Sequence, residues 1–207
     1  MKIIVFEGLD KSGKNSMSNI FTEELSKQGL KVKHSEFHRY DTPTGGLIRK
    51  YLYGEYKVPH EAIQCIMSAD KYAQLEWFKT LESKGLDVLV LDRFSLSQEV
   101  YASYFRESMD LTKTEKESLA EFDKALVSRL PKPYKTILLD ISAETSMQRT
   151  GQHGDNDLYE SNKALLTFVR NGYLSHDVTR IDAEQPFVKV TENIRKLARE
   201  TALEIKG

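Results

Sequence analysis

Short apolar runs alternate with longer amphipathic stretches along the chain. A short run of Val, Ile and Leu is typical of a strand buried on both faces, whereas apolar residues repeated every third or fourth position predict a helix. We expect strands at Lys2–Glu7, Lys31–Phe37, Asp87–Leu91, Thr136–Asp140 and Val178–Asp182. Because helical stretches separate these strands, the pattern favours βαβ units and an α/β fold, with a parallel sheet covered on both faces.

The stretches between the strands predict helices, and Gly or Pro marks several of their ends. We expect them at about Lys14–Ser26, Leu47–Tyr53, Pro59–Leu81, Ser97–Phe105, Thr114–Ser128, Ala143–Arg149, Leu158–Tyr173 and Phe187–Ile205. Thr42–Gly46 is expected to form a turn, and Thr150–Asp157 a polar loop. No internal repeat, low-complexity tract or linker divides the sequence, which predicts one domain over residues 1–207.

The length and composition suit one globular domain with a sizeable core. Of 207 residues, 40% are hydrophobic, and 30 basic against 31 acidic side chains leave a formal charge of −1. That balance does not favour a nucleic-acid polymer or an anionic membrane as the partner. The sequence has one cysteine, Cys65, no apolar run as long as a membrane span, and no signal-peptide pattern at its start. We therefore expect a cytoplasmic protein, or one in the host cytoplasm if it is viral.

A glycine-rich segment directly follows the first apolar run. Gly8, Gly13 and Lys14 have the spacing G-x-x-x-x-G-K of a phosphate-binding loop. Such a loop turns backbone N–H groups toward phosphates at the positive end of a helix, and its lysine reaches the β- and γ-phosphates. The residues expected to hold the phosphates of a nucleotide are Gly8, Ser12, Gly13, Lys14, Asn15 and Ser16. The motif usually has Ser or Thr directly after the lysine, whereas here Asn15 stands there and Ser16 comes one place late.

Asp92 and Arg93 follow the buried strand that ends at Leu91. Ligands of open α/β sheets bind at the carboxyl ends of the strands. A carboxylate there can order Mg²⁺ through water, and a guanidinium can clamp a phosphate with two hydrogen bonds. The pair therefore predicts a second part of a phosphate site.

Several segments, in the same order along the chain, resemble the thymidylate kinase family of P-loop nucleoside monophosphate kinases. They are FEGLDKSGK at 6–14, FHRYDTPTG at 37–45 with His38 in place of the family's proline, VLVLDRFSLSQEVYA at 88–102, LPKPYKTILLDISAETSMQR at 130–149 and DLYE at 157–160. The resemblance implies a three-layer α/β/α P-loop NTPase fold, with a five-stranded parallel sheet and a small lid at about 150–157. It also implies ATP-dependent phosphorylation of a deoxynucleoside monophosphate with Mg²⁺, usually by a homodimer.

The resemblance implies roles for residues around the phosphates. Phe37 and Arg39 lie in the F-H-R-Y segment, whose arginine grips the phosphate of the acceptor nucleotide. Arg93 bridges the acceptor phosphate and the transferred phosphate. Asp10 accepts a hydrogen bond from the acceptor's 3′-hydroxyl or helps to order water around the metal.

Two further cations lie near the predicted loop. Lys11 stands beside Asp10 within it, and Arg149 ends the predicted helix before a lid segment, Thr150–Glu160, that has no Lys or Arg. We expect Lys11 and Arg149 to neutralise the transition state together with Lys14, because phosphoryl transfer depends on charge neutralisation and alignment.

The resemblance also implies how the protein recognises the sugar and the base of the acceptor nucleotide. Tyr101 matches a sugar-contacting tyrosine, and with Tyr159 it crowds the 2′ position, which favours deoxyribose. Met67 and Lys71 stand where the family usually has a stacking aromatic and an arginine that donates to O4 of thymine. Gln98 is expected to contact the base edge. A flexible methionine and a lysine without arginine's fork recognise thymine less specifically, so dUMP or a 5-modified dUMP stays open beside dTMP.

Asn15 changes how Mg²⁺ would be held. Without a hydroxyl directly after Lys14, we expect the ion to depend on phosphate oxygens and water, on Asp92 and Asp10, or on the Asn15 amide oxygen.

Other functions fit parts of the pattern. A deoxynucleoside kinase would need a carboxylate base for an unphosphorylated acceptor, whereas Arg39 and Arg93 favour a monophosphate. A nucleotide-binding switch or assembly protein could use the loop without transferring phosphate to a small molecule, although Asn162–Leu165 lacks the aspartate of a guanine-reading N-K-x-D motif. A relative that binds nucleotide without activity is the third alternative.

Overall fold

The structure is a computed structural model of the protein, and it describes residues 1–149 and 162–207. The predicted lid at about 150–157, the first residues of the predicted helix Leu158–Tyr173, and Tyr159 lie outside the described residues.

A five-stranded parallel sheet forms the centre of the molecule. Its strands are β1 (Lys2–Glu7), β2 (Val32–Glu36), β3 (Val88–Asp92), β4 (Lys135–Asp140) and β5 (Thr179–Asp182). They lie in the order β2-β3-β1-β4-β5, and every pair of neighbours is parallel. The predicted parallel sheet is confirmed, and its order places the end of β1 between the ends of β3 and β4.

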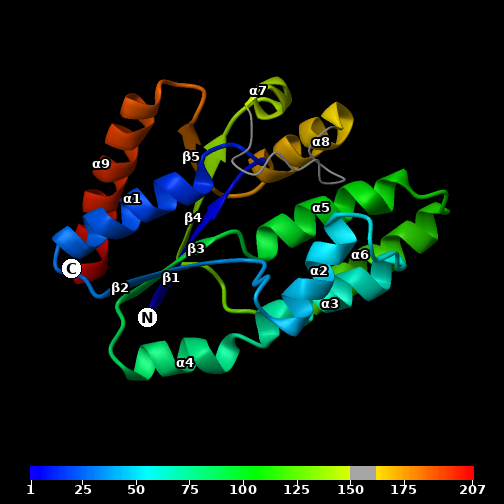
Figure 1. The fold of residues 1–207 in the computed structure, drawn as a ribbon, viewed down its shortest axis with the longest axis horizontal. Coiled ribbons are helices and arrows are strands. Elements are labelled where there is room, and N and C mark those ends of the chain that lie inside the picture. Colours follow the sequence, from blue (N-terminus) through cyan, green and yellow to red (C-terminus); the bar gives the residue numbers. More distant parts are fainter. Residues whose placement is uncertain (150–161) are drawn as a thin grey trace.

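Helices cover both faces of the sheet, as the apolar runs predicted. On one face, Ile4 and Phe6 belong to a core shared with α1 (Lys14–Lys27) and α9 (Phe187–Lys206), which lie side by side in Figure 1. On the other face, Ile3 and Val5 share a core with α4 (Leu75–Ser83). Because successive side chains of a strand point to opposite faces, both faces of β1 are buried. The three-layer α/β/α arrangement is confirmed.

The described residues form six further helices. They are α2 (Pro43–Leu52), α3 (His60–Tyr72), α5 (Ser95–Ser108), α6 (Lys113–Val127), α7 (Ala143–Gln148) and α8 (Lys163–Leu174). Figure 1 shows α2, α3, α5 and α6 grouped to the right of the sheet. Ile48 of α2 packs on Ile63 and Met67 of α3 in a separate small core.

The predicted single helix Pro59–Leu81 is wrong, because α3 ends at Tyr72 and α4 begins at Leu75. The two halves bury their apolar side chains in different places. Met67 packs on α2, whereas Phe78 lies 6.3 Å from Phe94, centroid to centroid, in the core under the sheet. One straight helix cannot reach both cores.

Two predicted boundaries also differ. The expected turn Thr42–Gly46 is the first turn of α2, because Thr42 caps the helix by accepting a hydrogen bond from the Gly45 N–H, and proline is favoured at the first helical position. The helix expected from Leu158 begins at Lys163, where the Asn162 side chain caps it by accepting from the Leu165 N–H. No helix of the described residues is long and apolar enough to cross a membrane.

Candidate active site

The glycine-rich loop joins the end of β1 to the start of α1. Gly8 has a φ of +144°, and a Cβ there would lie 2.5 Å from the carbonyl oxygen of Leu139 on β4, so only glycine fits. Gly13, with a φ of +88°, precedes α1 and has no side chain to cap it. The first backbone N–H groups of α1 therefore lack a helical partner and face outward at the positive end of the helix. This arrangement suits a phosphate.

Lys14 lies nearly buried within the loop, at 7% exposure. Its Nζ donates to the Leu9 carbonyl at 2.8 Å and lies 3.8 Å from Oδ1 of Asp10. Burial, and then the nearby Arg93, lower the pKa of Lys14. The lysine is thus held inside the predicted phosphate loop.

Asp10 and Arg93 form an ion pair between the loop and the end of β3. Arg93 also donates from Nη1 to the Ser97 hydroxyl at 2.9 Å and to the Tyr173 hydroxyl at 3.2 Å. Burial on its own would raise the pKa of Asp10, but Arg93 and Lys14 hold the pKa below its ordinary value. Asp10 is therefore an ionised acceptor next to two cations.

Glu7 is a buried carboxylate that the sequence reading missed. Its Oε1 accepts from the backbone N–H groups of Phe94 at 3.1 Å and Ser97 at 3.2 Å, and Ser97 Oγ donates to Oε2. Burial raises the pKa of Glu7. Phe94 offers no side-chain cap to α5, so Glu7 of β1 caps that helix instead. A charged residue that closes an apolar strand was the signal for this role.

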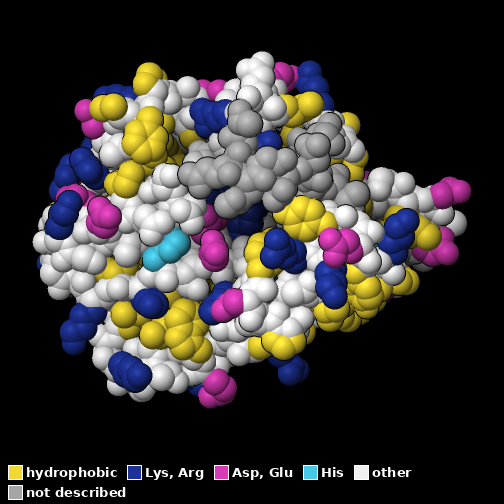
Figure 2. Space-filling model, in the orientation of Figure 1, with side chains coloured by type: hydrophobic (Ala, Val, Ile, Leu, Met, Phe, Trp, Pro, Cys, Tyr) yellow, Lys and Arg dark blue, Asp and Glu magenta, His cyan; other side chains and the backbone are white. Residues whose placement is uncertain are grey.

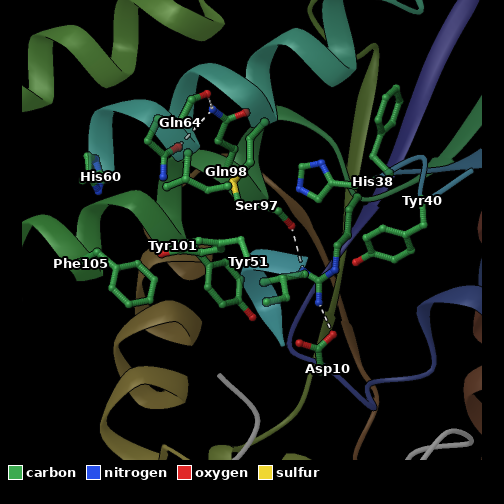
Figure 3. A pocket seen from close by; sticks show the side chains of 15 residues that line it. Asp10, His38, Tyr40, Tyr51, His60, Gln64, Ser97, Gln98, Tyr101 and Phe105 are labelled. Atoms are coloured by element: carbon green, nitrogen blue, oxygen red, sulfur yellow. Dashed lines mark hydrogen bonds and ion pairs between the residues drawn. The ribbon is translucent and has the colours of Figure 1, made fainter. Parts of the chain in front are cut away.

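A pocket opens beside the Asp10–Arg93 pair. Residues predicted for the acceptor line it together: Asp10, Phe37, Met67, Arg93, Gln98 and Tyr101. Residues that the sequence reading did not assign complete the walls, among them Tyr40, Tyr51, His60, Gln64 and Phe105 (Figure 3). Figure 2 shows a hollow in the middle of this face, with charged side chains of both signs beside it. The structure therefore brings six of the predicted acceptor residues together around one pocket.

Lys71 lies behind the pocket wall at 1% exposure. Its Nζ donates to Gln98 Oε1 at 2.9 Å and to the Met67 carbonyl at 3.1 Å. Burial lowers the pKa of Lys71 to about 8. Gln98 Nε2 in turn donates to Ser68 Oγ at 2.9 Å and to Gln64 Oε1 at 3.1 Å. Lys71 thus orients Gln98, and the structure does not bring the Lys71 ammonium to the pocket surface.

Arg39 is placed apart from the Asp10–Arg93 pair. Its guanidinium bonds to Asp41 at 3.2 Å and 3.3 Å and to Gln74 at 3.3 Å, and lies 5.8 Å from the Trp77 ring centroid. It lines a neighbouring surface hollow, together with Asn15 of α1. The predicted grip on the acceptor phosphate would require the Arg39 side chain to turn.

Arg149 lies against the backbone of Lys11 beside the loop. Arg149, which ends α7, donates to the Lys11 carbonyl at 3.2 Å and to the Ala183 carbonyl at 2.8 Å. Lys11 has a φ of +65°, in the left-handed region where a non-glycine residue is uncommon.

The donors available for Mg²⁺ are few. The side chain of Asp92 is 8% exposed and accepts no hydrogen bond from the residues that the structure describes. The amide oxygen of Asn15 accepts from Asn19 Nδ2 at 3.3 Å. Within residues 1–149 and 162–207, no group of three His, Cys, Asp or Glu side chains could hold a metal ion. An ion here would keep several water and phosphate ligands, as Mg²⁺ prefers, so the residues present fit it.

A phosphate loop at the end of the central strand, next to a pocket with an aspartate and an arginine, defines a P-loop nucleotide-binding protein with room for a second ligand. Comparison with protein families gives the particular group. The model of the family described as thymidylate kinase matches residues 6–194. The chain belongs to the thymidylate kinase family, a family of ATP-dependent nucleoside monophosphate kinases.

Individual relatives agree with this assignment. Thymidylate kinase of Plasmodium falciparum is 39% identical over 102 residues, a match that covers 49% of this chain and 48% of that protein. This match thus spans about half the length of the relative. Human thymidylate kinase is 27% identical over 206 residues, which cover 96% of this chain and 90% of the human protein. The fold matches a thymidylate kinase structure from Candida albicans with a TM-score of 0.81 and 24% identity, over 97% of this chain and 92% of that one.

Proposed function

We propose that this protein transfers the γ-phosphate of ATP to dTMP or a related pyrimidine deoxynucleoside monophosphate, giving the diphosphate and ADP. The single observation that carries the proposal is the ion pair between Asp10, inside the phosphate loop, and Arg93, inside the second pocket. This pair joins the phosphate loop to the second pocket. An in-line transfer requires the donor and acceptor phosphates to lie close together, as binding at these two neighbouring sites would arrange.

The roles of the residues follow from their positions. The loop N–H groups and Lys14 would hold the ATP phosphates, and Arg93 would hold the acceptor phosphate and neutralise the transferred group. Arg149 donates a hydrogen bond to the Lys11 carbonyl, and the two cations would add further positive charge next to the transferred phosphate. Asp10, ionised, would accept a hydrogen bond from the sugar's 3′-hydroxyl.

Asp92, through water, and the Asn15 amide oxygen would help to hold Mg²⁺, which would supply positive charge to the transferred group. We infer that Asp92 orients its water ligands, because this carboxylate has no hydrogen-bond donor among the described residues.

A monophosphate acceptor fits better than a nucleoside. The carboxylate nearest the pocket, Asp10, is paired with Arg93 and has a lowered pKa, so it is a weak base for a 5′-hydroxyl proton. An already ionised phosphate needs no such base.

The test is an ADP-release assay with dTMP, dUMP, dCMP, dGMP, dAMP and UMP, and with thymidine as a separate arm. We expect the greatest stimulation with a pyrimidine deoxynucleoside monophosphate. The Arg93→Lys variant should lose most of this stimulation, because lysine lacks the planar fork, whereas the exposed Lys27→Ala variant should match the parent. ADP release that no monophosphate stimulates would overturn the proposal, and stimulation by thymidine alone would favour a deoxynucleoside kinase.

We also propose that the protein is a homodimer, as the family resemblance implies. Size-exclusion chromatography with light scattering tests this directly, and a monomeric mass at micromolar concentration would overturn it.

A further inference from the structure

His38 presents a hydrogen-bonding group to the acceptor pocket. Its ring comes from the segment after β2 and points into the pocket, on the wall across from Gln64 (Figure 3). The side chain is 16% exposed. In the segment that FHRY resembles, this position is a proline, whose side chain has no donor or acceptor. This chain therefore has a polar group where the resembled pattern has none.

Asp70 of α3 fixes which nitrogen of the His38 ring carries the proton. The Asp70 carboxylate is fully buried and lies 3.2 Å from His38 Nδ1. It also accepts from the Arg39 N–H at 3.1 Å, from Thr44 Oγ1 at 2.9 Å and from Thr42 Oγ1 at 3.2 Å. Burial on its own would raise the pKa of Asp70, but His38 and these donors hold the pKa at about 2, so the carboxylate is ionised. An ionised carboxylate only accepts hydrogen bonds, and so Nδ1 must be the protonated nitrogen.

The remaining nitrogen, Nε2, is then an acceptor. Burial and the nearby Lys71 lower the pKa of His38 to about 4, so the ring is neutral near pH 7. A neutral imidazole protonated at Nδ1 has a bare lone pair at Nε2. Asp70 thus presets His38 as a hydrogen-bond acceptor on the pocket wall.

The side-chain oxygens of the two amides on the pocket wall, Gln98 and Gln64, already accept hydrogen bonds. Gln98 is fully engaged, since its Oε1 accepts from Lys71 and its Nε2 donates to Ser68 and Gln64. Gln64 Oε1 accepts from Gln98, which leaves the Gln64 amide N–H as a donor. Gln64 thus presents a donor to the pocket and His38 an acceptor, beside the hydroxyls of Tyr40, Tyr51 and Tyr101 on the other walls.

We propose that His38 is a specificity-determining residue whose Nε2 accepts a hydrogen bond from an N–H or O–H group on the base edge of the acceptor monophosphate. The inference rests on the proposed function, because it assigns the base of that acceptor to this pocket. The ring N3–H of thymine or uracil, the 4-amino group of cytosine and a 5-hydroxymethyl group on uracil share the required chemistry.

Two variants distinguish the role of Nε2, which faces the pocket, from the role of Nδ1, which bonds to Asp70. His38→Asn keeps an amide N–H close to the position of Nδ1 but is too short to reach the pocket. His38→Gln extends an amide oxygen to about the position of Nε2. Three pairs of nucleotides differ mainly in one donor: dTMP and N3-methyl-dTMP, dCMP and its analogue without the 4-amino group, and 5-hydroxymethyl-dUMP and dTMP. Isothermal titration calorimetry gives each Kd without turnover.

We expect the parent and His38→Gln to bind the donor-bearing member of at least one pair about tenfold more tightly, and His38→Asn to bring that ratio close to one. The pair affected identifies the donor. No preference in any pair, or a preference that His38→Asn leaves unchanged, would overturn the inference.

A measurement on the parent protein covers the case in which His38→Asn does not fold. The ¹⁵N resonance of His38 Nε2 should move upfield when the preferred nucleotide is added, as a bare nitrogen does on accepting a hydrogen bond. An unchanged resonance at saturation would overturn the inference. Neither readout uses ADP release, so a protein that binds but does not phosphorylate would contradict only the proposed function.

Discussion

Gly45 lies directly against the backbone of Arg39: a Cβ added to Gly45 would stand 1.8 Å from the Arg39 carbonyl oxygen. This contact packs the first turn of α2 onto the segment that contains His38 and Arg39. The next residue, Gly46, would meet nothing within 4 Å of an added Cβ. Two neighbouring glycines of one helix thus differ in whether the structure has room for a side chain at their positions.

We expect Gly45→Ala to destabilise the protein by about 3 kcal/mol, because the backbone of the 38–44 segment must move. Gly46→Ala should instead stabilise it by about 0.5 kcal/mol, since alanine favours a helix over glycine. Urea unfolding followed by circular dichroism measures both. Equal effects of the two substitutions would contradict the packing described.

Glu7 offers a second stability test, because it satisfies two backbone N–H groups at the start of α5. Glu7→Gln keeps an acceptor oxygen and should lower the free energy of unfolding by about 1 kcal/mol. Glu7→Leu leaves both N–H groups buried without partners and should lower it by about 3 kcal/mol. The difference between the two variants in urea unfolding isolates the capping role. A leucine variant no less stable than the glutamine variant would exclude that role.

Lys11 is expected to act on the transferred phosphate. Lys11→Ala should lower kcat roughly a hundredfold, the size of effect seen when one preorganised donor to a transition state is removed, with little change in the acceptor's KM. Steady-state ADP release at saturating ATP measures both constants. Lys27→Ala, at the exposed far end of α1, serves as the control and should be unchanged. An unaltered kcat for Lys11→Ala would rule out the proposed role.

Asn15→Thr tests how magnesium is held. A hydroxyl directly after the loop lysine usually binds Mg²⁺, so this variant should reach half-maximal activity at a lower Mg²⁺ concentration than the parent. Lys27→Ala, at the exposed far end of α1, is the control, and we expect its Mg²⁺ dependence to follow the parent's. Identical Mg²⁺ titrations of Asn15→Thr and the parent would mean that position 15 does not contact the metal.

His38 predicts a loss of stability in mild acid. Its pKa in the folded protein, about 4, lies below the ordinary value of 6.5, because the ring is buried and close to Lys71. As the pH falls below 6.5, the unfolded chain takes up a proton that the folded protein does not. The contribution of His38 is therefore fully present above pH 6.5 and is lost on the way down to about pH 4, by roughly 3 kcal/mol.

His38→Asn removes this titration, so its free energy of unfolding should fall less steeply over the same pH range. Urea unfolding at half-unit steps of pH provides the comparison, with His176→Asn, an exposed histidine, as a control that should follow the parent. Parallel curves for His38→Asn and the parent would show that His38 titrates normally.

Much of the fold was predictable because its signals are local. The apolar runs of β1 and β3 are buried on both faces, and Gly8, Gly13 and Lys14 mark the loop whichever parts of the chain surround them. The break between α3 and α4 was not predictable, since Tyr72–Leu75 contains neither Gly nor Pro. The two helices separate because Met67 and Phe78 pack in different hydrophobic cores.

The sequence by itself determined the parallel α/β architecture and the phosphate loop, because these depend on periodicity and on spacing along the chain. Only the tertiary structure decided which side chains line the pocket. It placed Lys71 behind Gln98, turned Arg39 toward Asp41 and Gln74, and set His38 on the pocket wall with its tautomer fixed by Asp70. The physical reason is that a side chain's hydrogen-bond partners come from elements distant in the sequence, as Glu7 and Ser97 do, and these meet only when the chain is folded.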